Sequence, residues 1–176
     1  MTEPSRRTFG FTLLEVLAVA SILAILVVLA YPNMNDYLAR AREVVCMSNM
    51  KSITAAFNLY LLDHEAIWPQ QPEHHDSPQW DAFWIQSLED YGITAKTWQC
   101  PEIRALLIPV ARREEDIPKV HYTPTSFPPI KGIPYRWSTQ PWLIEQANAH
   151  GKGSLIAFPD GSVKSLFKVL AEQGAR

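Results

Sequence analysis

The chain has 176 residues, of which 47% are hydrophobic, and its formal net charge is −2. This length suits one modest domain beside a membrane anchor. Because the charge is near zero and no basic block is present, the composition excludes nucleic acid as an implied partner.

The first predicted element is an apolar helix over residues 11–31, in which Glu15 is the only charged residue. A helix of this length spans about 30 Å, the thickness of the hydrocarbon core of a bilayer. Arg6 and Arg7 precede it. The positive-inside rule therefore predicts a single transmembrane segment, with the N-terminus in the cytoplasm and the rest of the chain across the membrane.

Glu15 needs an explanation, because a charge at the centre of a membrane costs about 2.5–3.5 kcal/mol. A plain anchor, belonging to a monomeric binding protein, accounts for the arginines but leaves the glutamate unexplained. A cleaved secretory signal would use the small-residue sequence at 28–30 and release a secreted enzyme that begins at Tyr31. Its apolar core is longer than the usual length of about 7–15 residues.

The residues around Glu15 offer a third interpretation. In order they are Gly10, Phe11, Thr12, Leu13, Leu14, Glu15 and Val16. This run resembles the processing site of type IV prepilins and of the pseudopilins of type II secretion. The resemblance implies that residues 1–10 are a leader, that a prepilin peptidase cuts after Gly10, and that the new amino group on Phe11 is N-methylated.

The same resemblance implies a role for Glu15 in assembly. After cleavage the amine on Phe11 would be positively charged at the edge of the bilayer, and a carboxylate of the same or an adjoining subunit would neutralise it. Such pairing offsets two desolvation costs at once. We therefore predict assembly with identical or related pseudopilins through the N-terminal helices, on an assembly platform of the inner membrane.

We expect the N-terminal helix to cover residues 11–62 despite Pro32. Proline removes a backbone hydrogen bond inside a helix, but membrane helices tolerate it, and a bend at this depth resembles the pilin pattern. The alternative is a helix that ends at Pro32. Helical spacing resumes beyond it in an apolar stripe, which should dock onto the globular domain. The stripe consists of Cys46, Met50, Ile53, Phe57 and Tyr60.

Residues 63–176 form the predicted periplasmic domain, which opens on a proline-rich loop over residues 63–77. A metal site in this loop is conceivable, but the spacing of its ligands fits no zinc template, so we predict no metal site and no cofactor. The residues concerned are His64, Glu65, His74, His75 and Asp76.

A short aromatic helix is predicted from Pro78 to a stop at Gly92. We expect its aromatic side chains to pack in the core; the alternative is that they form a partner-binding surface.

Cys46 and Cys100 are the only cysteines. If the domain lies outside the membrane, its compartment is oxidising and a disulfide is plausible. The bond would tie the apolar stripe to the segment before Pro101. The alternative is two small buried thiols.

Residues 154–166 predict a β-hairpin, because Pro159, Asp160 and Gly161 suit a tight turn. His150 precedes Asp160 by nine intervening residues. This spacing, followed by Gly161, resembles the C-terminal signature of a pseudopilin-like family. We predict a structural role, in which Asp160 binds turn amides and His150 meets the hairpin end. A catalytic His–Asp pair is the alternative, although no nucleophile motif accompanies it.

Together these features predict an α+β protein with a long helical stem and a small β-containing domain, as in type IV pilins. The predicted function is that of a structural pseudopilin, not an enzyme, in a type II secretion filament; a minor pilin of a type IV pilus is the alternative. Some pseudopilins bind calcium in a C-terminal loop, but Asp160 is the only acid near that position, so we predict no calcium site.

Overall fold

The structure is a computed structural model that describes residues 12–30, 34–72 and 78–174. Its contacts divide the chain into two compact units, Met1–Leu38 and Ala39–Arg176. The second unit contains the sheet and the hydrophobic core. It is therefore the unit that positions most of the candidate site residues.

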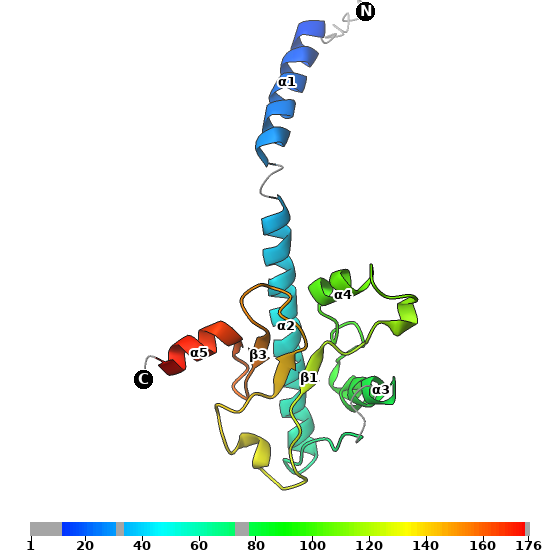
Figure 1. Ribbon diagram of the computed structural model, residues 1–176, viewed down its shortest axis with the longest axis vertical. Helices are drawn as coiled ribbons and strands as arrows, with labels where there is room; N and C mark the ends of the chain where they lie inside the picture. Colours follow the sequence, from blue (N-terminus) through cyan, green and yellow to red (C-terminus); the bar gives the residue numbers. More distant parts are fainter. Residues whose placement is uncertain (1–11, 31–33, 73–77, 175–176) are drawn as a thin grey trace, which may run out of the picture. The chain divides into compact units, whose positions relative to one another are not determined.

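In the described part of the chain, α-helices come first, four short strands follow, and one further helix comes after the last strand (Figure 1). The helices are α1 (Leu13–Ala30), α2 (Met34–Asp63), α3 (Pro78–Ser87), α4 (Pro101–Leu107) and α5 (Leu166–Gly174). The strands are β1 (Tyr122–Pro124), β2 (Leu143–Glu145), β3 (Leu155–Ala157) and β4 (Val163–Ser165). Three 3₁₀ turns also lie within the described residues, at Glu89–Tyr91, Glu114–Asp116 and Ile133–Tyr135.

The four described strands form one antiparallel sheet in the order β1-β2-β3-β4. In its register Thr123 faces Ile144, Leu143 faces Ala157, and Ala157 faces Val163. Along β2 the side chains alternate, so that Leu143 and Glu145 are buried. Strand geometry requires this alternation, because successive side chains point to opposite faces.

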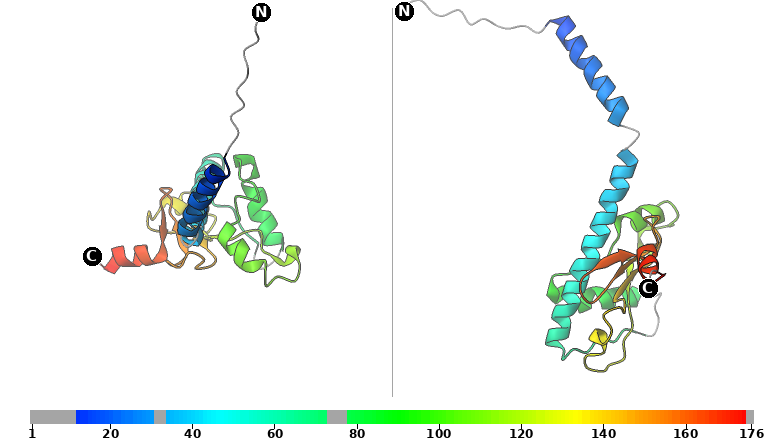
Figure 2. Two further views of the ribbon diagram at one scale, coloured as in Figure 1. Left: turned by 90° about the horizontal axis from the view of Figure 1, so that it is seen from above. Right: turned by 90° about the vertical axis from the view of Figure 1, so that its left-hand side faces the viewer.

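The C-terminal part of α2 packs along the sheet, as two perpendicular views show (Figures 1 and 2). Its inner face is the apolar stripe, of which Cys46, Met50, Ile53 and Phe57 are fully buried. Leu61, rather than Tyr60, continues the buried face at the end of the helix. The predicted α+β architecture, a helical stem packed on a small β-containing domain, is confirmed.

Aromatic rings form the centre of the core. Phe57 stacks on Trp68, with ring centroids 4.3 Å apart, and meets Trp84 edge-on at 5.8 Å. Trp68 in turn meets Trp142, which precedes β2, at 5.2 Å. Offset and edge-to-face pairs of this kind add about 0.5–1.5 kcal/mol each to the stabilisation from burial. The ring contacts therefore connect α2, α3 and the sheet.

Two helices in the second unit differ from the expected pattern. The predicted aromatic helix ends at Ser87, and a 3₁₀ turn then leads to Gly92, which caps it with a φ of 80°. At the other end of the domain, α5 was not predicted. It projects away from the sheet (Figures 1 and 2), and its Phe167 and Leu170 are more than half exposed.

Gly153 allows the chain to pass closely beneath α5. Its φ is +80°, and a Cβ placed there would lie 2.9 Å from the Cβ of Leu166. We expect Gly153→Ala to cost about 1–2 kcal/mol in backbone strain and a further 1–3 kcal/mol or so in overpacking. The free energy of unfolding, measured by urea denaturation, checks this value.

Gly161 supplies the matched control for Gly153→Ala. Its φ is +78°, but no atom lies within 4 Å of the position where its Cβ would stand. Gly161→Ala should therefore show the backbone strain alone. Equal losses of stability in the two variants would mean that the contact with Leu166 does not matter.

Candidate functional site

Thr12 immediately precedes α1, and Glu15 lies in the first turn of this helix. The Glu15 N–H donates to the Thr12 Oγ1 at 3.3 Å and to the Thr12 carbonyl at 3.1 Å. Threonine is a good N-cap, and an acidic side chain in the first turn is favoured by the helix dipole. The Glu15 side chain itself is exposed.

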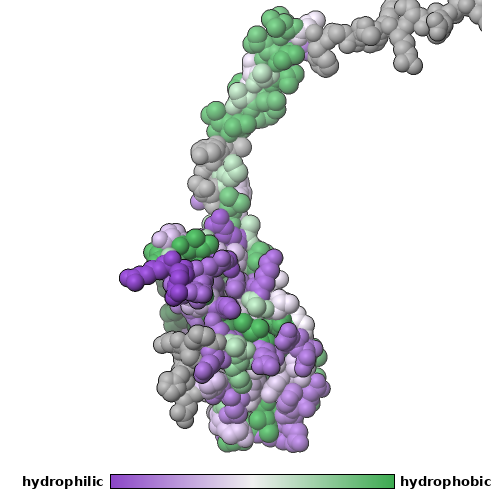
Figure 3. All heavy atoms as spheres, turned by 90° about the vertical axis from the view of Figure 1, so that its right-hand side faces the viewer, coloured by the Kyte–Doolittle hydropathy of each residue, from purple (hydrophilic) through white to green (hydrophobic). Residues whose placement is uncertain are grey.

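The rest of the α1 surface is apolar. Figure 3 shows one face of this helix covered by hydrophobic side chains. Ser21 is the other polar residue within α1, and its Oγ donates to the Leu17 carbonyl at 2.7 Å. A serine that bonds to the preceding turn needs no outside partner. Glu15 is therefore the one charged group of α1.

Several predicted features lie outside the described residues. They are the processing positions Gly10 and Phe11, the proline at Pro32, and the histidines and acid at 74–76. The predicted membrane span, residues 11–31, extends beyond α1 at both ends. Across residues 12–30, 34–72 and 78–174, no helix meets the combined length and hydropathy needed for a membrane crossing.

Cys46, on the buried face of α2, is joined by a disulfide to Cys100, the residue that precedes α4. His121 holds the Cys100 backbone in place, because its Nδ1 accepts from the Cys100 N–H at 3.0 Å. The His121 Nε2 then lies 3.0 Å from the Pro118 carbonyl, to which it donates. Burial lowers the pKa of His121, and the backbone carbonyls of Cys100 and Pro118, at 3.3 Å and 3.0 Å from its ring nitrogens, oppose this shift.

We predict that native Cys46 and Cys100 react with an alkylating reagent only after reduction, which mass spectrometry would detect. The bond closes a loop with a sequence separation of 54 residues. The chain-entropy model assigns about 4 kcal/mol to a loop of this size. The double variant Cys46→Ser, Cys100→Ser should therefore lose about 2–4 kcal/mol of unfolding free energy. Alkylation without reductant would contradict the pairing.

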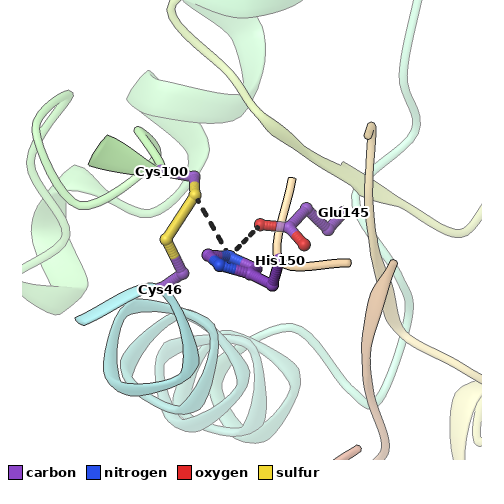
Figure 4. A group of neighbouring side chains, drawn as sticks. All are labelled: Cys46, Cys100, Glu145 and His150. Atoms are coloured by element: carbon purple, nitrogen blue, oxygen red, sulfur yellow. Dashed lines mark hydrogen bonds and ion pairs between the residues drawn. A yellow bond between two sulfur atoms is a disulfide. The ribbon is translucent and has the colours of Figure 1, made fainter. Parts of the chain in front are cut away.

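His150 lies between the disulfide and a buried glutamate at the end of β2 (Figure 4). Its Nε2 is 3.2 Å from the Glu145 Oε1 and 3.7 Å from the Cys100 Sγ. The His150 and Glu145 side chains are 2% and 0% exposed. The ligand atoms of these two residues and of both cysteines all lie within 4.8 Å of one another.

Two contacts keep the Glu145 carboxylate in place. Its Oε2 accepts from the Leu155 N–H at 3.2 Å, while Oε1 faces His150. Burial raises the pKa of Glu145, and the bond from Leu155 and the proximity of His150 oppose that rise. A buried carboxylate without such partners would be strongly destabilising.

Asp160 and Gly161 have a different environment from His150. Asp160 Oδ1 accepts from the Ser162 N–H at 2.8 Å in the turn between β3 and β4. Hydrogen bonds from the side chain and from the backbone of Ser162 lower the pKa of Asp160. Gly161 supplies the left-handed φ of the turn. The contacts of His150 are instead with Glu145 and Cys100, so the two halves of the C-terminal signature support different local structures.

Sequence reasoning did not identify Glu145 as a member of this cluster, or His121 as the residue that holds the Cys100 backbone. Each has a local signal, because Glu145 follows three apolar residues and His121 stands between Val120 and Tyr122. A single polar residue in an apolar strand is a candidate for a buried, hydrogen-bonded group. The sequence does not reveal the partner of either residue.

The helical stem, the small antiparallel sheet and the single carboxylate of α1 together define a pilin-like structural subunit. Comparison with known proteins agrees with this class. Residues 5–31 match the family described as the prokaryotic N-terminal methylation motif. The chain thus carries a prepilin-type N-terminus, which suggests a membrane-anchored pilin-like protein.

Two curated proteins are similar to the chain. The ComG operon protein 3 homolog of Bacillus licheniformis is 25% identical over 107 residues, which cover 61% of this chain and 96% of that protein. The type II secretion system core protein G of Pseudomonas aeruginosa is 38% identical over 61 residues, or 35% of this chain and 43% of that protein. No solved structure matches the chain.

These relatives confirm the resemblance to pseudopilins that the N-terminal residues indicated. Together with the N-terminal motif they support a pilin-like structural subunit, so the prediction that this chain is a structural subunit and not an enzyme is also confirmed. The alignment with the secretion protein spans less than half of that protein. Its particular system and partners therefore belong to the proposal that follows.

Proposed function

We propose that the chain is a pseudopilin that a prepilin peptidase processes and that assembles into a type II secretion filament. Cleavage after Gly10 removes the leader, residues 1–10, and the new amino group on Phe11 is N-methylated. The match of residues 5–31 to the N-terminal methylation motif supports this processing. The alignment with a type II secretion core protein supports the choice of system.

The same proposal gives the chain a defined topology. Residues 11–31 cross the inner membrane once, the N-terminus stays in the cytoplasm, and residues 63–176 lie in the periplasm. Arg6 and Arg7 support this orientation through the positive-inside rule. The exposed apolar side chains of α1 support a lipid or helix-packed environment for this segment, because water would not favour so many of them.

Glu15 is the observation that carries the proposal. It is the one charged group of α1, its backbone is capped by Thr12, and its side chain is exposed. Its carboxylate is therefore available to the amine on Phe11 of its own or a neighbouring subunit. That ion pair would set the register between stems of identical or related pseudopilins on the inner-membrane platform.

A minor pilin of a type IV pilus is the second candidate. The longer of the two alignments is with a ComG operon protein and not with the secretion protein, which favours a broader class of pilin-like filament. The chemistry of Gly10, Phe11 and Glu15 would be the same in either system. The two candidates differ in whether the assembled filament exports proteins or is a surface pilus.

Deletion of the gene in its host separates the two candidates. A secretion pseudopilin predicts that exported enzymes accumulate in the periplasm while surface pili persist, and that the intact gene restores export. Loss of pili with normal export would assign the chain to the pilus. Normal export together with normal pili would contradict both assignments.

A further inference from the structure

The buried cluster of Cys46, Cys100, Glu145 and His150 has the composition of a metal site. Two thiolates, an imidazole and a carboxylate are the ligand types that Zn²⁺ uses in proteins. Their ligand atoms lie within 4.8 Å of one another, and Figure 4 shows the His150 ring directed between the sulfur atoms and the carboxylate. The sequence predicted no metal here, because the ligands come from three distant segments.

We propose that the dithiol form of the chain binds one Zn²⁺ through Cys46, Cys100, His150 and Glu145, and that formation of the disulfide closes this site. The metal and the disulfide are thus alternative cross-links between α2 and the residue before α4, and the metal would also connect both to the end of β2. The site needs no neighbouring subunit, so the proposal does not depend on filament assembly.

The distances from the His150 Nε2 to two of the other ligand atoms already suit a tetrahedral site. Standard Zn–N, Zn–O and Zn–S bond lengths imply ligand separations of about 3.3 Å between nitrogen and oxygen and about 3.6 Å between nitrogen and sulfur. The Glu145 Oε1 and Cys100 Sγ lie 3.2 Å and 3.7 Å from the His150 Nε2. The two sulfur atoms, which the disulfide joins, have to move apart, and reduction permits this.

The surroundings hold the ligands in position. The Leu155 N–H bonds to the Glu145 Oε2 at 3.2 Å, which leaves Oε1 for the metal. His121 fixes the backbone of Cys100 through the bond at 3.0 Å. Partners of this kind orient metal ligands, and their loss typically lowers affinity by about 10–100-fold. All four side chains are buried, as in closed structural zinc sites.

A dithiol is the reductant that opens the Cys46–Cys100 disulfide before the metal binds. Thiol–disulfide exchange transfers two electrons from the dithiol to the Cys46–Cys100 bond, so the reductant becomes a disulfide and the chain gains two thiols. On binding Zn²⁺ the two thiols lose their protons to solvent and each sulfur donates an electron pair. His150 donates the Nε2 lone pair with its proton on Nδ1, and Glu145 donates through Oε1.

Cobalt binding tests the proposal on the full-length protein in mild detergent. The chain is reduced with dithiothreitol, freed of reductant without oxygen, and titrated with Co²⁺, whose thiolate charge-transfer and tetrahedral d–d absorption report the ligand set. The expected result is one Co²⁺ per chain, displaced by one Zn²⁺, and no such absorption for the oxidised protein. Absence of these bands in the reduced protein would overturn the proposal.

Single variants identify the ligands. His150→Ala and Glu145→Gln should each weaken Co²⁺ binding by about tenfold or more. His64→Ala is the matched control, because His64 is exposed and stacks on Tyr60, and it should bind as the wild type does. Wild-type affinity in His150→Ala would count against the site.

If reduction unfolds the domain, tryptophan fluorescence tests the site instead. Five tryptophans are fully buried, so their emission reports whether the domain is folded. Recovery of the native spectrum on addition of Zn²⁺, but not of Mg²⁺, would support the site, because metal binding is then coupled to folding. A reduced protein that stays unfolded with Zn²⁺ would contradict it.

Discussion

Replacing Glu15 with valine should leave the chain processed and inserted but reduce its incorporation into filaments about a hundredfold or more. Loss of one partner from a buried ion pair costs about 3–5 kcal/mol, because the other charge stays uncompensated. In the proposed filament that other charge is the amine on Phe11. Because about 1.4 kcal/mol corresponds to a tenfold change in an equilibrium, the defect should be near complete.

The assay compares the fraction of the variant in sheared or cross-linked filaments with its amount in the membrane. Ser21→Ala is the matched control, because Ser21 is the other polar residue of α1 and already bonds to the Leu17 carbonyl. It should assemble normally. Glu15→Asp, which keeps the charge, should assemble better than the valine variant. Wild-type incorporation of Glu15→Val would remove the main support for the ion pair.

Replacing Phe57 with alanine should cost about 3–5 kcal/mol of unfolding free energy, the usual loss for a large buried aromatic side chain. Phe57 is fully buried, stacks on Trp68 at 4.3 Å and meets Trp84 and Trp98 edge-on. Its removal would open a cavity between α2 and α3. Because most domains have only about 5–15 kcal/mol of stability, the variant would be close to unfolding.

Urea denaturation of the full-length protein, followed by tryptophan fluorescence, measures this loss. Leu62→Ala on the same helix is the control, because Leu62 is 77% exposed. Its effect should stay within about 0.5 kcal/mol. Similar losses in both variants would show that the buried side of α2 does not anchor the domain.

Local patterns predicted the elements that depend on neighbouring residues. The helical spacing of Cys46, Met50, Ile53 and Phe57 identified the buried side of α2, because a helix repeats about every 3.6 residues whatever it packs against. The residues from Pro159 to Gly161 likewise indicated the turn between β3 and β4, whose conformation they favour locally.

Apart from the pairing of Cys46 with Cys100, features that depend on distant contacts were not predicted. Strands β1 and β2 have three residues each, too few for a periodic signal, and they exist because β1 pairs with β2 and β2 pairs with β3. The contact between His150 and Glu145 also depends on this pairing, since Leu155 of β3 holds the carboxylate. The spacing between His150 and Asp160 suggested a shared role, but each is held by other partners.

The mature N-terminus of the native chain is the most direct test of the account. Sequencing and intact-mass measurement of the protein purified from host membranes should give a chain that begins at Phe11 and carries one additional methyl group on its amine. A native chain that retains residues 1–10, or one that begins at Tyr31, would contradict processing as a pseudopilin.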